Sequence, residues 1–213
     1  LKVLSKETFP DNWKYFDWKE ITILNEKVII SRSGFSNELG WEIYFRKNNN
    51  TEKVGDYILE EGKKMGMILT GTPGFRCKRI ESGLLSAGQD FNHETNPYDV
   101  GLGKYVDLKK NYFIGKSALM TADKEKRCWG IRVENGTGLK GTYIKFNNEV
   151  IGKITSSTWS PFQKCGVGIV LMNSTKYKPG LIVDVSCNDN KIHKGEICTC
   201  LLYTSDAADD LIG

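Results

Sequence analysis

The chain has 213 residues, of which 39% are hydrophobic and 11% aromatic. This is enough apolar material for a packed core in one large domain or two small ones. The net charge of +4 is modest, and basic and acidic residues are interspersed, so the composition argues against nucleic-acid binding. No apolar run reaches the ~18 residues of a transmembrane helix, which argues against a membrane protein.

Six cysteines and two histidines are the residues that could suggest metal or redox chemistry. The cysteines form no C-x-x-C pair, and His93 and His193 are far apart in the sequence. The pattern therefore predicts no metal site. Scattered single cysteines are typical of a reducing compartment, so we expect a cytoplasmic protein.

The first part of the chain mixes strand and helix patterns. Residues 21–31 alternate around Asn25-Glu26 and predict a β-hairpin. Residues 41–45 are aromatic and β-branched, which predicts a strand. Residues 51–66 place apolar side chains at helical spacing between a polar N-cap and a glycine, and residues 75–85 predict a second helix.

The second part of the chain changes character. A short strand is predicted over residues 105–108 and a helix from residue 114. From residue 128 onward, short strands alternate with turns at regular spacing, which predicts a β-barrel or sandwich. We therefore expect an α+β domain over residues 1–124 and a β-barrel-like domain over residues 125–199.

The two ends of the chain carry separate expectations. The sequence begins with Leu1 rather than methionine, and we interpret it as a fragment without its N-terminal part. Residues 200–213 begin CLLYTSDAAD, which resembles the translation of a sequencing-library adaptor. We therefore expect a non-native tail there, the alternative being a real acidic tail.

The strand predicted at residues 41–45 raises a question about Glu42. Side chains alternate along a strand, so Trp41, Ile43 and Phe45 face one way while Glu42 and Tyr44 face the other. A buried carboxylate without a partner would be costly. The residues alone leave two interpretations open, a glutamate on a solvated face paired with a lysine, or a carboxylate that binds a ligand.

Three passages, in order along the chain, resemble the aminomethyltransferase family, that of the glycine-cleavage T-protein. The family also includes dimethylsulfoniopropionate demethylases and the folate domains of sarcosine and dimethylglycine dehydrogenases. The passages are SRSGFSNELGWEIYF at 31–45, RIESGLLSAGQDFNHETNPYDVGLGKYV at 79–106 with FIGKSAL after it, and VIGKITSSTWSPFQKCGVGIVLM at 150–172. The resemblance implies an α+β fold, the folate-binding aminomethyltransferase fold in part, followed by a C-terminal β-barrel-like domain.

The resemblance also implies which residues bind tetrahydrofolate, the expected cofactor. The family's glutamate at the position of Glu42 binds the pterin ring, whose N–H and exocyclic amine are two donors that a carboxylate can accept. Tyr15 and Phe16 match an aromatic pair that lies against folate, and Phe35 stands where the family usually has a tyrosine. Aromatic faces suit a flat heterocycle, although Phe16 and Phe35 would suit ordinary core packing as well.

Two stretches depart from the T-protein pattern. T-proteins have close to R-D-x-x-R-[LI]-E-[AS]-G at the second predicted helix, and the first arginine contacts folate. Here Phe75 replaces that arginine and Arg76 replaces the aspartate, so the resemblance makes Arg76 the candidate for this contact. The string NPYDVGL at 96–102 is instead similar to the demethylase-like branch, with Tyr98 as a candidate substrate-side residue.

The function implied by the resemblance is transfer of a methyl or aminomethyl unit from a small substrate to tetrahydrofolate. A carrier protein is a further expected partner, whereas nucleic acid and membrane are not. The family's catalytic aspartate precedes the matched region, so we assign no catalytic residue and expect the fragment to be inactive alone. Two alternatives stay open, the folate-binding domain of a flavin-dependent N-methyl amine dehydrogenase and a non-catalytic folate-binding protein.

Overall fold

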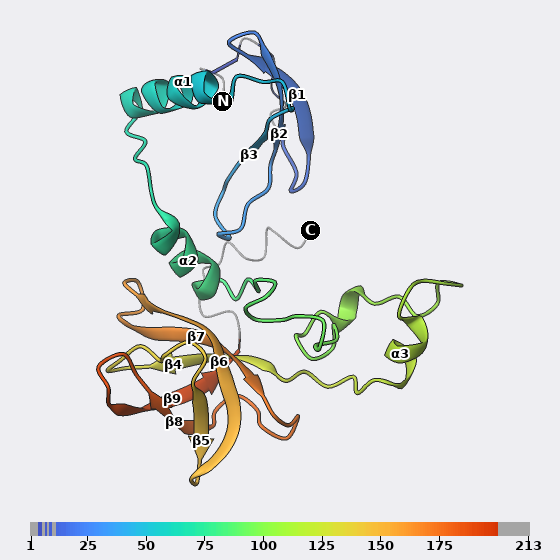
Figure 1. Cartoon of the computed structure of the whole chain (residues 1–213), viewed down its shortest axis with the longest axis vertical. Coiled ribbons are helices and arrows are strands. Elements are labelled where there is room, and N and C mark those ends of the chain that lie inside the picture. Colours follow the sequence, from blue (N-terminus) through green and yellow to red (C-terminus); the bar gives the residue numbers. More distant parts are fainter. Residues whose placement is uncertain (1–3, 6, 8, 10–11, 200–213) are drawn as a thin grey trace. The chain divides into compact units, whose positions relative to one another are not determined.

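The computed structural model describes residues 4, 5, 7, 9 and 12–199 (Figure 1), so the predicted non-native tail at 200–213 lies outside the described residues. The chain divides into two compact units, one ending at Phe75 and the other beginning at Arg76. Each unit is described by itself. The domain boundary expected near residue 125 rests on the change to short strands, and it stays a prediction.

A three-stranded antiparallel sheet forms most of the first unit. Strands β1 (Trp18–Ile23), β2 (Glu26–Ser31) and β3 (Glu42–Tyr44) are adjacent in that order. Leu24 and Asn25 connect β1 and β2, and both have positive φ angles, as a two-residue hairpin turn of the favoured hand requires. The hairpin and the strand predicted from the sequence are therefore confirmed, with the turn one residue earlier than the predicted Asn25-Glu26.

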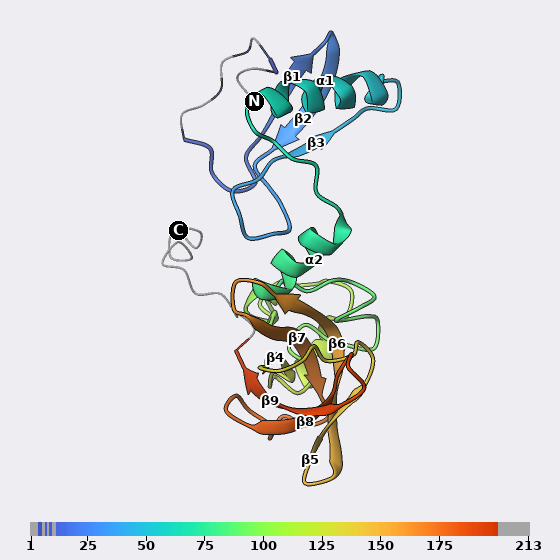
Figure 2. The same cartoon turned by 90° about the vertical axis from the view of Figure 1, so that its left-hand side faces the viewer.

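Helix α1 (Thr51–Lys64) lies across one face of this sheet (Figure 2). The Asn50 side chain accepts a hydrogen bond from the Lys53 backbone N–H at 3.1 Å, so Asn50 is the N-cap, one residue before the predicted start. The face beneath the helix carries the buried core, which excludes water from the apolar side of the strands. The core residues are Phe9, Ile21, Ile23, Val28, Ile30 and Val54.

Helix α2 (Thr72–Glu81) begins earlier and ends earlier than predicted. Pro73 lies in its first turn, where a missing N–H costs nothing. Gly83 takes a φ of +67°, and the Leu84 N–H bonds the Arg79 carbonyl at 2.8 Å. This is the Schellman ending that stops a helix at glycine, so the helix cannot extend to residue 85.

The segment after α2 holds only short elements, the 3₁₀ helix η1 (Gly103–Tyr105) and helix α3 (Lys116–Thr121). The strand predicted over 105–108 is wrong. The Asp107 carboxylate accepts a hydrogen bond from the Lys109 N–H at 2.9 Å, and this local turn replaces the strand-to-strand hydrogen bonds that a strand would need.

None of the helices in the described part of the chain has the length and apolar character to cross a bilayer.

Six antiparallel strands close into a barrel in the second unit, in the order β4-β7-β6-β5-β8-β9 (Figure 1). Their apolar side chains alternate into a packed interior that includes Ile131, Ile144, Ile154 and Val170. The barrel confirms the architecture predicted from the regularly spaced strands. The strands are β4 (Cys128–Val133), β5 (Tyr143–Phe146), β6 (Glu149–Ser160), β7 (Cys165–Met172), β8 (Ile182–Ser186) and β9 (Ile192–Cys198).

Candidate functional site

The open face of the three-stranded sheet is the face that α1 does not cover. Trp18 pairs with Ser31 across β1 and β2, and Ser31 pairs with Glu42 across β2 and β3. Paired residues on neighbouring strands project to the same face, and Tyr44 joins them because it lies two residues beyond Glu42. We call this surface, with Trp18, Ser31, Glu42 and Tyr44, the open face.

Glu42 is held at one end of this face by two hydroxyl donors. Its Oε2 accepts hydrogen bonds from Ser33 Oγ and from Tyr44 Oη at 2.8 Å. The bond from Ser33, and then that from Tyr44, keep the pKa of this carboxyl below its ordinary value. Glu42 is therefore an anion at neutral pH, and it is exposed.

The other oxygen of Glu42, Oε1, has a different environment. In the part of the chain that the structure describes, no hydrogen bond to Oε1 is recorded. A carboxylate has about four acceptor positions, so two donors on Oε2 leave room for about two more. The arrangement can accept a pair of N–H donors and fix their direction.

Two of the predicted aromatic residues are joined to the segment that holds this carboxylate. Tyr15 Oη donates to the Gly34 carbonyl at 3.0 Å, and Gly34 directly follows Ser33, which holds Glu42. The Tyr15 and Phe16 rings are 4.4 Å apart in an edge-to-face pair. Tyr15 is therefore anchored next to the serine that holds Glu42, with the Phe16 ring against its own.

Phe16 has an unusual backbone conformation. Its φ is +70°, which costs a non-glycine residue on the order of 1–3 kcal/mol. The Phe16 N–H bonds the Arg32 carbonyl at 2.9 Å and so holds the conformation in place. The ring is 71% exposed, so core packing does not explain it.

The remaining predicted site residues differ in their surroundings. Phe35 is half-buried and packs against Phe75, with ring centroids 6.1 Å apart. Arg76 belongs to the second unit. Its Nε is buried, and no described residue accepts a hydrogen bond from it, which is a costly arrangement that an acceptor would relieve.

Sequence reasoning missed the roles of three residues at this site, Tyr44, Ser33 and Trp18. The alternation that placed Tyr44 beside Glu42 could have suggested their hydrogen bond. The role of Ser33 depends on the chain path after β2, which no local pattern specifies. Trp18 joins the face only through the β1–β2 register, which the hairpin turn sets.

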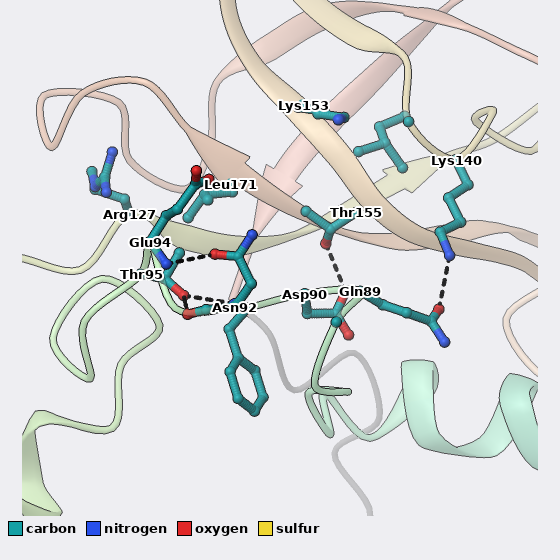
Figure 3. A pocket seen from close by; sticks show the side chains of 14 residues that line it. Gln89, Asp90, Asn92, Glu94, Thr95, Arg127, Lys140, Lys153, Thr155 and Leu171 are labelled. Carbon is teal, nitrogen blue, oxygen red and sulfur yellow. Dashed lines mark hydrogen bonds between the residues drawn. The ribbon is translucent and has the colours of Figure 1, made fainter.

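A separate hollow of about 470 Å³ lies in the second unit (Figure 3). Its charged lining is mixed, with Glu94 opposite in sign to Lys140 and Lys153. Lys140 Nζ donates to Gln89 Oε1 at 3.1 Å, and Thr155 Oγ1 donates to Asp90 Oδ1 at 2.6 Å. None of the predicted site residues lines this hollow.

The demethylase-like string at 96–102 has a structural role in the second unit. Asn96 Oδ1 accepts from the Tyr98 N–H at 2.8 Å, which fixes a turn. Asp99 pairs with Arg127 at 2.8 Å and raises the pKa of that guanidinium. Tyr98 is buried, with Lys124 Nζ 4.5 Å from its ring centroid.

Among the described residues, no group of three or more His, Cys, Asp or Glu side chains gathers as a metal site would.

Comparison with known proteins identifies the fold. A solved structure of the glycine cleavage system aminomethyltransferase T from Bartonella henselae superposes with a TM-score of 0.74 at 20% identity. The match covers 91% of this chain and 54% of that one. The two units described above therefore adopt part of a T-protein fold.

Sequence comparison then gives the family. The family model described as the GCVT N-terminal domain matches residues 1–110. An aminomethyltransferase from Halothermothrix orenii is 31% identical over 191 residues, which are 88% of this chain and 53% of that relative. A probable aminomethyltransferase from Thermococcus gammatolerans is 32% identical over 203 residues. The chain belongs to the aminomethyltransferase family, as the three passages suggested, and it spans about half the length of these curated relatives.

Proposed function

We propose that the open face binds the pterin of tetrahydrofolate, and that the whole protein transfers a one-carbon unit to tetrahydrofolate. The observation that carries the proposal is the state of Glu42, an exposed anion with one oxygen hydrogen-bonded and the other available. The family membership supports it, because the relatives are named aminomethyltransferases.

The residues present fit a pterin. Two N–H donors on one edge of the heterocycle match the acceptor positions that remain on Glu42. The exposed rings of Tyr15 and Phe16 supply apolar faces for a flat ring system. When bound, tetrahydrofolate supplies the nitrogen that receives the one-carbon unit. The contribution of this chain is to orient the ring and to exclude water from one face of it.

The relatives' names favour an aminomethyl donor. The string at 96–102 suggested a demethylase-like donor instead, but its Asn96 and Asp99 serve a turn and an ion pair. We therefore propose aminomethyl transfer, with a small aminomethyl substrate or a carrier protein that delivers it. No catalytic residue is assigned among the described residues. Phe35 and Arg76 stay proposed folate contacts that rest on the family pattern.

The test replaces Glu42 with glutamine, which keeps the shape and removes the charge. Tetrahydrofolate binding to the 213-residue chain, measured by calorimetry, should weaken by about 1.5–3 kcal/mol, the range of a charge-assisted hydrogen bond. The matched control is Glu60→Gln, another exposed carboxylate, on α1, which should leave affinity unchanged. Unaltered affinity of a folded Glu42→Gln variant would refute the assignment.

A further inference from the structure

Trp18 is the largest side chain on the open face, and nothing in the sequence pattern pointed to it. Its side chain is 67% exposed, although exposed apolar surface of this size is costly in water. A tryptophan placed on the face of a candidate ligand site is a ready stacking surface. Its position relative to Glu42 then decides which part of a ligand it can meet.

The sheet register fixes that position. Trp18 and Glu42 both pair with Ser31, from opposite sides. Neighbouring strands lie about 4.8 Å apart, so the two backbone positions are separated by about 10 Å across the open face. A ligand with two ring systems suits this separation between Trp18 and Glu42, because a single pterin held at Glu42 is shorter than the distance to Trp18.

The surface beside Trp18 is hollowed and aromatic. Trp18 and Phe16 line one hollow of about 360 Å³, together with Trp13, Asp17 and Lys19. Phe16 contacts Tyr15, and Tyr15 bonds Gly34 next to the residue that holds Glu42. Tyr15, Phe16 and Trp18 are thus three exposed aromatic residues close together in the chain, and Tyr15 is anchored next to the serine that holds Glu42.

We propose that Trp18 stacks on the second ring system of the folate, its p-aminobenzoyl group, while Glu42 holds the pterin. The inference rests on the proposed function, since it assumes that Glu42 binds the pterin edge. Trp18 is then a binding residue that selects folates over simple pterins, and it takes no part in the transfer itself.

The test compares two ligands, tetrahydrofolate and a 6-methyl tetrahydropterin that lacks the aminobenzoylglutamate. Trp18→Ala should weaken tetrahydrofolate binding by about 5- to 150-fold, the range found when an aromatic platform for a base is removed. It should leave affinity for the tetrahydropterin unchanged. Trp18→Phe, which keeps a ring, should retain most of the tetrahydrofolate affinity. Glu42→Gln should instead weaken the binding of both ligands.

The controls separate this inference from the proposed function. Tyr112→Ala removes another strongly exposed aromatic ring, in the second unit, and should change neither affinity. Unchanged tetrahydrofolate affinity in Trp18→Ala, or an equal loss for both ligands, overturns the role of Trp18 alone. If the unchanged chain binds neither ligand, the proposed function fails, and the inference fails with it.

Discussion

The buried ion pair between Arg79 and Asp90 allows a sharp prediction for the second unit. Arg79 Nη1 lies 2.7 Å from Asp90 Oδ2, and the two side chains are 4% and 0% exposed. The pair connects α2 to the segment after it. Thr155 on β6 also donates to Asp90, at 2.6 Å, so one carboxylate joins three parts of the unit.

Replacing Asp90 with alanine leaves the guanidinium buried without its counter-charge. Arg79 keeps bonds to the Leu84 carbonyl at 3.0 Å and to Ser156 Oγ at 2.7 Å, which are neutral acceptors. The Ser86 N–H loses its acceptor as well. Removing one partner of such a pair costs about 3–5 kcal/mol, a large share of the ~5–15 kcal/mol that stabilises a domain.

Urea unfolding followed by tryptophan fluorescence measures this loss, because Trp129 and Trp159 lie in the second unit. The control is Glu125→Ala, which breaks the Lys178–Glu125 pair, whose side chains are 50% and 61% exposed. That pair should contribute less than about 1 kcal/mol. A loss in Asp90→Ala no larger than the control's would refute the structural role of the buried pair.

Three further predictions concern glycines and pH. Gly55→Ala, in α1 at a position where an added methyl group would meet open space, should stabilise the first unit by about 0.5–1 kcal/mol in a denaturant titration. Gly166→Ala, whose Cβ would lie 2.0 Å from the Gly136 carbonyl oxygen, should destabilise the barrel by about 1–3 kcal/mol. Because the pKa of Glu42 is lowered from 4.5, its contribution to stability should persist above pH 4.5 and disappear as the pH falls through the folded-state pKa. The test is to measure the free energy of unfolding of the wild-type chain and of Glu42→Gln from neutral pH down into the acid range. The difference between the two should shrink as the pH falls.

Local patterns predicted the positions of the hairpin and of the barrel strands, although the barrel itself is closed by pairing between strands distant in the sequence. The β1–β2 hairpin follows from alternation and a two-residue turn, and the barrel follows from evenly spaced strands. The early end of α2 was also encoded locally, in Gly83, but the apolar residues beyond it suggested a longer helix. The strand predicted over 105–108 failed because Asp107 satisfies the backbone within its own turn.

The candidate site was predictable only in part. A family resemblance pointed to Glu42, Tyr15 and Phe16, and in the structure Tyr15 and Phe16 bond the segment that also holds Glu42 through Ser33. The hydroxyls that hold the carboxylate come from Ser33 and Tyr44, and Ser33 reaches it through a path that only the folded chain defines. Trp18 depends on strand register, which is a property of paired strands and not of any one sequence segment.

A crystal structure of the chain with tetrahydrofolate bound would test the central claim most directly. The account predicts the pterin edge on the open face, with its N–H donors within hydrogen-bond distance of Glu42 and with Oε1 among the acceptors. Folate bound in the hollow beside Lys140 and Lys153, with Glu42 contacted only by Ser33 and Tyr44, would contradict it.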